Sequence, residues 1–384
     1  MDGAAVNPLV VLGATGSIGR QTLEVADRLE IPVAAVAARR GSDELLQLAL
    51  QYPEADVAVA APTGAEREHL TGRLGARVGF GAGSLVDLAG RTDVTVVNGV
   101  VGAAGLAASV AALEAGNRLA LANKESLVAG GPVLKRALEQ GGGELLPVDS
   151  EHSALLQCLT GEDLSSVARL ILTASGGPFR GRDAGSMASV TVAEALAHPT
   201  WSMGPRITID SATLMNKAFE VIEAHLLFDL PYDQIDVVVH PQSIVHSLVE
   251  FEDGSLKAHL GEPDMRVPIQ YAITHPARRP GPLAPFPLAA QTLTFEPPDR
   301  VAFPLLDIGY EAGRQGDSAP AVLNAADEIA VQAFLDGRIG FSAIPRVVAG
   351  ALERVPLRKL EQVADVVAVD EEARSVASEL AGTC

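Results

Sequence analysis

Cysteine, tryptophan and basic residues are all scarce in this sequence of 384 residues. Its two cysteines, Cys158 and Cys384, match no spacing of a cysteine-ligated metal site. So low a count in so long a chain is typical of a reducing compartment, so we expect no disulfides and a cytoplasmic location. The 29 lysines and arginines face 48 aspartates and glutamates, a net charge of -19. Such a field repels nucleic acid and anionic membranes, so an anionic small molecule needs a local pocket.

Long apolar runs are also missing. The alanine-rich stretches are interrupted by glycine, asparagine or charge before they reach the roughly 20 residues that span a bilayer, so we expect no transmembrane segment. The N-terminal MDGAAVNPLVVLGATG has neither the basic nor the apolar segment of a signal peptide, and we expect none. With 48% apolar residues the chain can bury substantial cores, and its length predicts two or three domains of about 100–200 residues each.

Residues 1–150 alternate short β-branched runs with alanine-, leucine- and glutamate-rich stretches. This alternation is typical of βαβ units and predicts an α/β, Rossmann-like domain with a mostly parallel sheet. The predicted strands are 9–12, 33–37, 57–59, 94–97 and 118–120.

The pattern changes after residue 150. Residues 151–275 predict an α+β domain with long polar loops, which often carry binding or catalysis. Its predicted strands are 170–173, 237–239 and 247–251. Residues 276–304 are rich in proline and predict an extended linker, because proline excludes a regular helix. Residues 305–384 predict a C-terminal helical bundle, with helices over 305–310, 319–335, 342–355 and 360–380.

A glycine-rich turn, Gly13 to Gly19, follows the first predicted strand and precedes a helical sequence. Glycines let the backbone turn sharply and approach a pyrophosphate at a helix N-terminus. The same motif also occurs as a simple tight turn, but the strand and helix around it favour a dinucleotide site. The candidate contacts are Thr15, Gly16, Ser17 and Ile18.

The second predicted strand ends at Arg39 and Arg40, where an NAD site usually has an acidic residue. Two guanidinium groups there suit a 2′-phosphate, so the sequence favours NADP(H). The alternative is an ordinary solvated strand end.

Two carboxylates, Asp149 and Glu151, lie two residues apart. On an extended segment alternate side chains point the same way, so we expect both to converge on one point. A hard divalent cation such as Mg²⁺ or Mn²⁺ would relieve their repulsion. The alternative is a solvated pair of acids in a loop.

A second polar group follows in IDSATLMNKAFEVIE, which predicts a helix after a cap at Asp210 and Ser211. At helical spacing Asn216 and Lys217 both share a face with Glu220, so this helix offers groups to a phosphate and to a metal. An amphipathic surface helix with ion pairs would show the same spacing.

Three loops add candidate residues. The loop TASGGPF resembles an anion cradle that contains Ser175. The loop HPTWSMG, residues 198–204, places the only tryptophan, Trp201, between proline and glycine, where we expect it to act as a lid. Asn123 and its neighbours follow a predicted strand at the edge where such sheets bind ligands.

Nine motifs together resemble the 1-deoxy-D-xylulose 5-phosphate reductoisomerase family. They occur in the family's order from about residue 8 to residue 335. They are GATGSIG, NKESLV, VDSEHSA, TASGGPF, HPTWSMG, IDSATLMNKAFEVIEAHLLF, HPQSIVHSLVEF, DGSLKAHLGEPDMRVPIQYA and LNAADEIAVQAFL.

The resemblance implies rearrangement and reduction of 1-deoxy-D-xylulose 5-phosphate to 2-C-methyl-D-erythritol 4-phosphate by a homodimer. The implied cofactors are NADPH and Mg²⁺ or Mn²⁺, with Co²⁺ as an alternative.

The implied metal ligands are Asp149, Glu151 and Glu220, and the implied catalytic residues are Lys124, Glu151 and His198. The implied substrate contacts are Ser150, Glu151, Ser175, His198, Trp201, Ser211, Asn216, Lys217 and Glu220, with Met203 beside them in the lid. The implied cofactor contacts are Thr15, Gly16, Ser17 and Ile18 of the turn, Arg39 and Arg40 after the second strand, and also Asn123, Glu125 and Gly204. The histidines His152, His198 and His240 are all candidates for moving protons.

The chain departs from the family's motifs at a few positions. Ala38 stands where glycine is commoner, Arg206 follows Pro205 where the pair commonly ends in lysine, and Asp327 stands where asparagine is commoner. None of these is a proposed ligand.

Two other functions are weighed against this one. An aspartate-semialdehyde dehydrogenase would share the glycine turn but needs a nucleophilic cysteine, and Cys158 has no evident base beside it in the sequence. A cofactor-binding regulatory protein that lost catalysis would not need the carboxylates at 149, 151 and 220.

Overall fold

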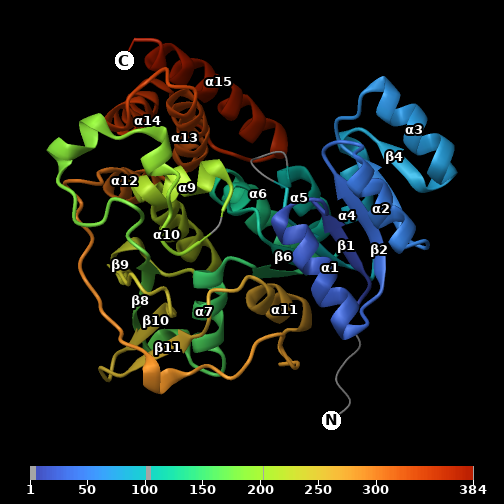
Figure 1. Cartoon of the computed structure of the whole chain (residues 1–384), viewed down its shortest axis with the longest axis horizontal. Coiled ribbons are helices and arrows are strands. Elements are labelled where there is room, and N and C mark those ends of the chain that lie inside the picture. The colour runs from blue at the N-terminus through green and yellow to red at the C-terminus, as the bar shows by residue number, and fades with distance from the viewer. Residues whose placement is uncertain (1–5, 101–104, 202, 384) are drawn as a thin grey trace. The chain divides into compact units, whose positions relative to one another are not determined.

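The computed structural model describes residues 6–100, 105–201 and 203–383, so Cys384 lies outside the described residues. The chain forms two compact units (Figure 1). Unit 1 is drawn from the ranges 1–127, 132–153 and 264–284, and unit 2 from 128–131, 154–263 and 285–384. The sequence-based domain boundaries at 150, 275 and 304 stay predictions.

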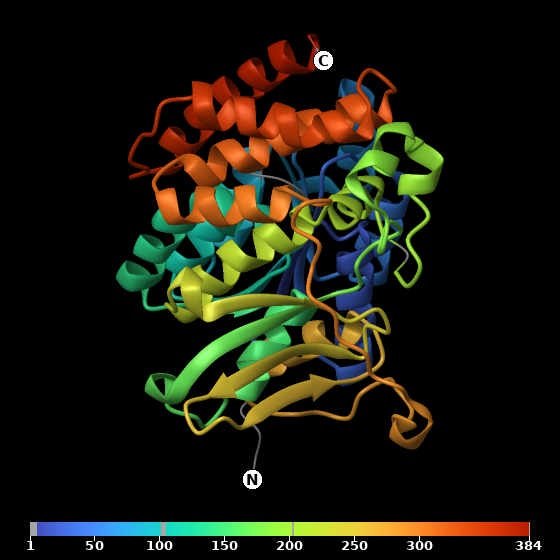
Figure 2. The ribbon, with the colours of Figure 1, turned by 90° about the vertical axis from the view of Figure 1, so that its left-hand side faces the viewer.

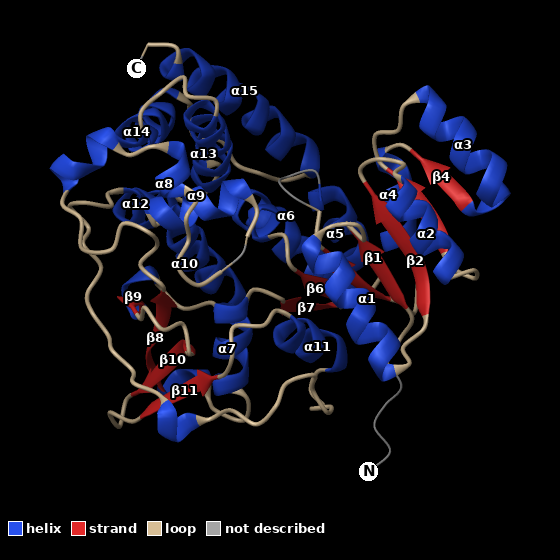
Figure 3. Cartoon of the chain, viewed as in Figure 1, coloured by secondary structure: helices blue, strands red, loops and turns tan. Residues whose placement is uncertain are grey.

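Unit 1 contains a seven-stranded parallel sheet in the order β4-β3-β2-β1-β5-β6-β7 (Figure 3). The predicted Rossmann-like α/β fold is confirmed, and the five predicted strands are right to within one residue. β4 and β7 were not predicted, because β4 is short and contains glycine and β7 ends in proline. The strand bounds are β1 Leu9–Leu12, β2 Val33–Ala38, β3 Asp56–Val59, β4 Val78–Phe80, β5 Thr95–Asn98, β6 Arg118–Leu121 and β7 Glu144–Pro147.

The helices of unit 1 connect successive strands. Local signals explain several of their ends: Thr63 and Glu66 form a reciprocal capping box at the start of α3, and Asn123 caps α6. The kinked helix α6 continues into residues that belong to unit 2. The bounds are α1 Ser17–Leu29, α2 Asp43–Gln51, α3 Gly64–Leu74, α4 Ala82–Ala89, α5 Leu106–Glu114 and α6 Lys124–Gly141.

A late segment of the chain completes unit 1. Helix α11, Arg266–Thr274, packs against α1, β6 and β7. The Arg118 guanidinium donates to the carbonyl of Ile273 at 2.7 Å, and the His275 ring lies 3.0 Å from the Glu144 carboxylate. Buried apolar side chains and these polar contacts therefore attach α11 to the end of the sheet.

Unit 2 contains a four-stranded mixed sheet in the order β11-β10-β8-β9. β8 runs parallel to β9 and antiparallel to β10. The edge strand β11 is exposed at most positions, so it has no apolar alternation from which to predict it. The bounds are β8 Val167–Ala174, β9 Ile235–Val239, β10 Val245–Phe251 and β11 Leu256–Leu260.

The helices of unit 2 form layers on this sheet (Figure 2). Helix α10 packs on β8 and β9 on one side and against α12 on the other. The approach is close, because a Cβ at Gly309 of α12 would lie 2.3 Å from the Ala218 Cβ of α10. Helix α13 packs against α14 and α15, so the predicted helical C-terminal region is confirmed. The bounds are α7 Ser150–Leu159, which begins in unit 1, α8 Val192–Ala195, α9 Pro205–Thr213, α10 Met215–Phe228, α12 Leu305–Gln315, α13 Ala319–Leu335, α14 Ile344–Arg354 and α15 Val363–Ala381.

In the part of the chain that the structure describes, no helix combines the length and apolar character needed to cross a membrane.

Candidate active site

The glycine turn of unit 1 lies where the strand order reverses, between β1 and β5. Gly13 has φ +85°, and a Cβ there would lie 2.7 Å from the carbonyl oxygen of Gly99. A Cβ at Gly19 would lie 2.3 Å from the carbonyl oxygen of Gly13. The turn is therefore closed in a way that only glycine permits. It leaves residues 15–18 exposed or half-buried at the start of α1, where helix N–H groups favour an anion.

The two arginines after β2 are both exposed, but they differ in their contacts. The Arg40 guanidinium lies 3.1 Å from the Glu66 carboxylate, the same group that caps α3. Glu66 and a 2′-phosphate would have to share the Arg40 guanidinium, whereas Arg39 has no such acid in the described contacts.

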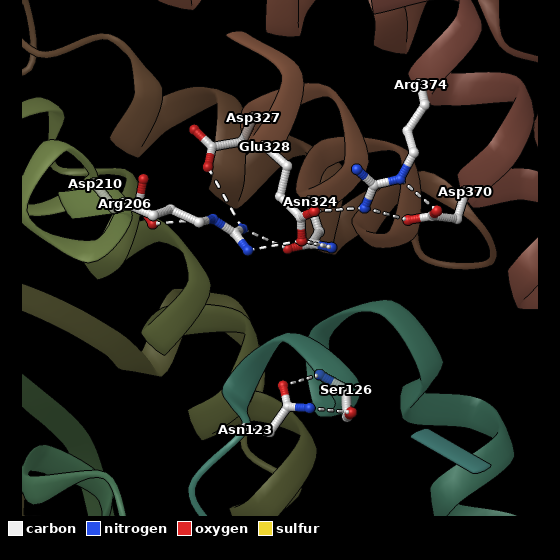
Figure 4. A network of polar contacts seen from close by, with 9 residues as sticks. All are labelled: Asn123, Ser126, Arg206, Asp210, Asn324, Asp327, Glu328, Asp370 and Arg374. Atoms are coloured by element: carbon white, nitrogen blue, oxygen red, sulfur yellow. Dashed lines mark hydrogen bonds and ion pairs between the residues drawn. The ribbon is translucent and has the colours of Figure 1, made fainter. Parts of the chain in front are cut away.

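Asn123 and Lys124 follow β6 directly. The Asn123 side chain accepts from the Ser126 N–H at 3.1 Å and donates to the Ser126 hydroxyl at 2.8 Å (Figure 4). These bonds fix the first turn of α6, so that Lys124 and the half-buried Glu125 begin the helix at the carboxyl end of the sheet.

Asp149 lies after β7, the strand next to β6, and its neighbours converge on it. The Lys124 ammonium is 2.5 Å from its carboxylate, and Nδ1 of His152 is 3.1 Å away. A carboxylate only accepts, so this His152 nitrogen carries the proton. Burial alone would raise the pKa of Asp149, but the Lys124 charge and the His152 ring outweigh burial and hold it well below its usual range.

The prediction of an extended segment at Asp149 and Glu151 was wrong. The Asp149 carboxylate accepts from the Glu151 N–H at 3.1 Å and thereby starts α7, so Glu151 lies in the first helical turn. The Ser150 hydroxyl donates to the Glu151 carboxylate at 2.6 Å. The two carboxylates are thus brought close by a helix cap rather than by strand alternation.

In unit 2, Ser175 and His198 meet after β8. Nε2 of His198 lies 3.0 Å from the Ser175 hydroxyl, while Nδ1 accepts from the N–H groups of Thr200 and Trp201 at 3.2 and 2.9 Å. Nδ1 is therefore unprotonated and the proton of the neutral ring lies on Nε2. Burial lowers the pKa of His198, which favours this neutral form. The loop that contains Trp201 is thereby tied to Ser175.

The anion-cradle loop also contacts α9. Gly177, at φ +64°, packs so tightly on this helix that a Cβ would lie 2.9 Å from the carbonyl oxygen of Ser211. Its N–H donates to the Ser175 hydroxyl at 3.2 Å. Ser175 and Ser211, both half-buried, are therefore held on neighbouring segments.

The prediction that Asp210 and Ser211 cap a helix was wrong. Helix α9 begins earlier, at Pro205 after Gly204, so both residues lie near its end. Leu214, at φ +61°, then separates α9 from α10. Proline at the first helical position is preorganised for helix, which explains the earlier start.

The predicted contacts on α10 are confirmed. The Asn216 amide donates to the Glu220 carboxylate at 2.6 Å, and the Lys217 ammonium is ion-paired with the same carboxylate. Lys217 and Glu220 are only 4% and 1% exposed, which excludes the alternative of a solvated surface pair.

The predicted site residues thus form one cluster in each unit. Lys124, Asp149 and Glu151 lie together in unit 1, with His152 as a partner that the sequence suggested only as a candidate. The Ser175 and α10 groups belong to unit 2, as does Gly204, while the other proposed cofactor contacts belong to unit 1. Asp327 and Arg206, noted only as departures, were missed as members of a buried polar cluster.

Comparisons with known proteins agree along most of the chain. Family models described as 1-deoxy-D-xylulose 5-phosphate reductoisomerase, its C-terminal domain, and the DXP reductoisomerase C-terminal domain match residues 9–131, 145–228 and 260–376. The chain is 50% identical over 384 residues to the 1-deoxy-D-xylulose 5-phosphate reductoisomerase of Heliobacterium modesticaldum, with 98% of each protein covered.

Solved structures agree as well. The enzyme of that name from Zymomonas mobilis, in complex with NADPH, superposes with a TM-score of 0.92 at 40% identity, covering 99% of this chain and 100% of that one. A DOX-P reductoisomerase in complex with NADPH, fosmidomycin and magnesium superposes with a TM-score of 0.91 at 36% identity, covering 98% of each. The chain belongs to the 1-deoxy-D-xylulose 5-phosphate reductoisomerase family.

Proposed function

We propose that the chain converts 1-deoxy-D-xylulose 5-phosphate to 2-C-methyl-D-erythritol 4-phosphate, with NADPH as reductant and a divalent metal as Lewis acid. One observation carries the proposal: each unit holds a nearly buried carboxylate that is balanced by a lysine of its own, Asp149 by Lys124 and Glu220 by Lys217. Burying an ion pair costs desolvation free energy that its own attraction offsets only in part, and such pairs are enriched at functional sites.

For the metal we propose Asp149, Glu151 and Glu220. Carboxylate oxygens are the ligands that Mg²⁺ and Mn²⁺ prefer, and the donor set therefore fits. When bound, such a cation polarises a carbonyl and neighbouring hydroxyl oxygens of the substrate. Lys124 and His152 keep Asp149 ionised, and Asn216 and Lys217 orient Glu220, so the chain prepares both carboxylates as ligands.

For the substrate phosphate we propose Ser175, Ser211, Asn216 and Lys217. Hydroxyl, amide and ammonium groups all donate to phosphate oxygens. Holding the unreactive phosphate end converts its binding energy into orientation of the reacting carbons.

For proton handling we propose Lys124, Glu151 and His198. The neutral His198 ring presents a donor at Nε2, and the Ser150 hydroxyl orients Glu151 beside Asp149. Trp201 and Met203, in the loop fixed by His198, would cover the substrate and exclude water.

For NADPH, which supplies the hydride, we propose Thr15, Gly16, Ser17, Ile18, Arg39, Arg40, Asn123, Glu125 and Gly204. The glycine turn fits a dinucleotide, because Cβ atoms at Gly13 and Gly19 would close the space that the turn needs. We further propose that the enzyme is a cytoplasmic homodimer. The low cysteine count supports the compartment, and size-exclusion chromatography with light scattering would test the dimer.

The test is NADPH oxidation, followed by absorbance, with 1-deoxy-D-xylulose 5-phosphate and Mn²⁺, with and without EDTA. Glu220→Gln should lower kcat/KM at least about 100-fold, because it removes a ligand charge. The control is Glu311→Gln, an exposed acid of α12 in the same unit, which should behave as wild type. No oxidation with any divalent metal would exclude the reaction; full activity in Glu220→Gln would reject only the ligand assignment.

A further inference from the structure

A buried polar cluster in unit 2 joins α9 to α13 (Figure 4). The Arg206 guanidinium donates to Glu328 at 2.6 Å and to the side-chain oxygen of Asn324 at 2.9 Å. It also lies 3.7 Å from the carboxylates of Asp327 and Asp210. One guanidinium therefore contacts three carboxylates and an amide oxygen, which is possible because it is planar and carries five N–H donors.

The place of Arg206 in the chain connects this cluster to the proposed phosphate contacts. Arg206 is the second residue of α9 and follows the 198–204 loop with only Pro205 between them. One turn later Asp210 faces the same guanidinium, and Ser211 is the next residue. The partners at 324, 327 and 328 belong to α13, which is buried along most of its length. Arg206 thus attaches α9 to the buried helix α13. The start of α9 adjoins the proposed lid loop, and Ser211 lies near its end.

The charges of the cluster favour a neutral Asp327. Asp327 is fully buried, and no N–H group of the described residues lies at hydrogen-bonding distance from its carboxyl oxygens. Asp327 and Asp210 both lie 3.7 Å from the one Arg206 guanidinium, so two ionised acids would compete for a single cation. Burial, and next the Asp210 charge, raise the pKa of Asp327 well above its usual range, although Arg206 acts in the opposite direction.

The ion pairs of this cluster join three helices. Arg206 and Asp210 lie on α9, Asp327 and Glu328 on α13, and Arg374 on α15. Arg374 contacts the second oxygen of Glu328 at 2.5 Å, and Asp370 holds it at 2.6 Å. Glu328 is therefore shared by Arg374 and Arg206, and Arg206 is the cation that also lies beside the acid pair.

We propose that Arg206 and Asp327 form a positioning pair for the substrate phosphate, which holds α9 so that Ser211 meets the phosphate in register. The inference rests on the proposed function of Ser211.

The first experiment is a double-mutant cycle with Arg206→Lys and Asp327→Asn. Arg206→Lys should raise the KM for the phosphosugar about tenfold and leave kcat and the KM for NADPH within about twofold, because a point charge cannot serve both the acid pair and Glu328. Adding Asp327→Asn should return that KM to within about threefold of wild type. The lysine at position 206 would then have to balance two acids, Asp210 and Glu328, instead of three.

Arg374→Lys is the matched control. It makes the same change beside the same Glu328, but on a helix that does not lead to Ser211, so it should lower Tm without raising the KM for the phosphosugar. If Arg206→Lys lowers Tm and leaves all KM values unchanged, or if Arg374→Lys shifts KM equally, the pair is merely structural and the proposal is wrong.

Protonation of Asp327 gives a second readout. As pH rises, ionisation of Asp327 should leave two carboxylates beside one Arg206 guanidinium, loosen α9 and raise the KM for the phosphosugar in wild type. Asp327→Asn, whose side chain does not ionise, should give a flatter profile. Equal profiles would contradict the proposal.

A third measurement does not depend on turnover. Inorganic phosphate should raise the Tm of wild type and of Arg374→Lys more than that of Arg206→Lys. Absence of NADPH oxidation in wild type together with this difference would reject the proposed reaction but keep the positioning pair. Equal phosphate shifts in all three proteins would reject the pair.

Discussion

Unit 1 and unit 2 position their candidate residues by different means. In unit 1 the glycine turn follows β1, while Lys124 and Asp149 follow the neighbouring parallel strands β6 and β7, paired as Leu121 with Pro147. In unit 2, Ser211 lies on a short helix that Arg206 attaches to acids more than a hundred residues away in the sequence. Backbone topology brings the residues together in the first case, whereas side-chain charge attaches the helix in the second.

This difference predicts how each unit fails. The glycine turn of unit 1, which contains no titratable side chain, should be sensitive to steric changes and insensitive to pH. A site held by buried polar side chains should respond to protonation, because each buried charge is stabilised by an opposite charge beside it. Four substitutions test the contrast, from the largest expected effect to the smallest.

Gly19→Ala should damage unit 1 most. The new Cβ would lie 2.3 Å from the Gly13 carbonyl oxygen and 2.5 Å from the Ala14 Cα, so backbone must move. We expect a loss of about 3 kcal/mol in the free energy of unfolding and weaker NADPH binding. Urea denaturation and a fluorescence titration with NADPH would measure both.

The control is Gly72→Ala in the interior of α3, where a Cβ would meet no atom within 4 Å. It should stabilise by about 0.5–1 kcal/mol, because alanine restricts the unfolded chain. If Gly19→Ala behaves like this control, the turn does not require glycine.

His246 on β10 should make the stability of unit 2 depend on pH. Burial, and then the neighbouring His259, lower the pKa of His246 to about 4. In the unfolded chain this histidine is protonated below about pH 6.5, whereas in the folded chain it stays neutral until about pH 4. Its contribution to the free energy of unfolding is therefore present at high pH and is lost as pH falls below about 6.5. Between pH 7 and 5 this group should cost about 2 kcal/mol.

The measurement is urea denaturation at both pH values in wild type and His246→Gln. Carboxylates titrate in both proteins, so the difference between the two pH dependences isolates the histidine. An identical pH dependence in the two proteins would show that His246 is not responsible.

Thr63→Ala should have a local effect in unit 1. The Thr63 hydroxyl accepts from the Glu66 N–H at 3.2 Å, and Glu66 accepts from the Thr63 N–H at 2.7 Å. Losing the hydroxyl should cost about 1 kcal/mol. Hydrogen exchange should increase in the first turn of α3 and remain unchanged in α13; a change in both would mean that the cap supports more than its own helix.

Arg20→Ala should have the smallest effect. Arg20 and Glu44 form an ion pair at 3.0 Å, but their side chains are 59% and 46% exposed. An exposed pair contributes less than about 0.5 kcal/mol, and salt reduces it further. A larger loss would weaken the claim that exposure separates this arginine from Arg206.

The sequence predicted the elements whose signals are local. The strand 9–12 and the helix 319–335 were right at both ends, because uniform apolar runs and periodic apolar positions mark them. The edge strand β11 was missed, since its side chains are largely exposed. The cap at Asp149 was also missed, although an aspartate before a periodic apolar segment is a helix-start signal.

The site was predictable in its residue types and only partly in its geometry. The contacts of Asn216 and Lys217 with Glu220 follow from helical spacing. The break at Leu214 could not be foreseen, because leucine rarely adopts positive φ and no local signal marks it. The Arg206 cluster was unpredictable because its α9 and α13 members are more than a hundred residues apart, and spacing says nothing about such pairs.

The return of α11 to unit 1 has a consequence for synthesis on the ribosome. Strands β6 and β7 are made by residue 147, but the helix that packs against them is made only at residues 266–274. Until then, the nascent sheet presents apolar surface that a chaperone or a neighbouring chain can bind. A fragment ending near residue 153 should therefore aggregate, and supplying residues 264–284 as a separate peptide should reduce that aggregation.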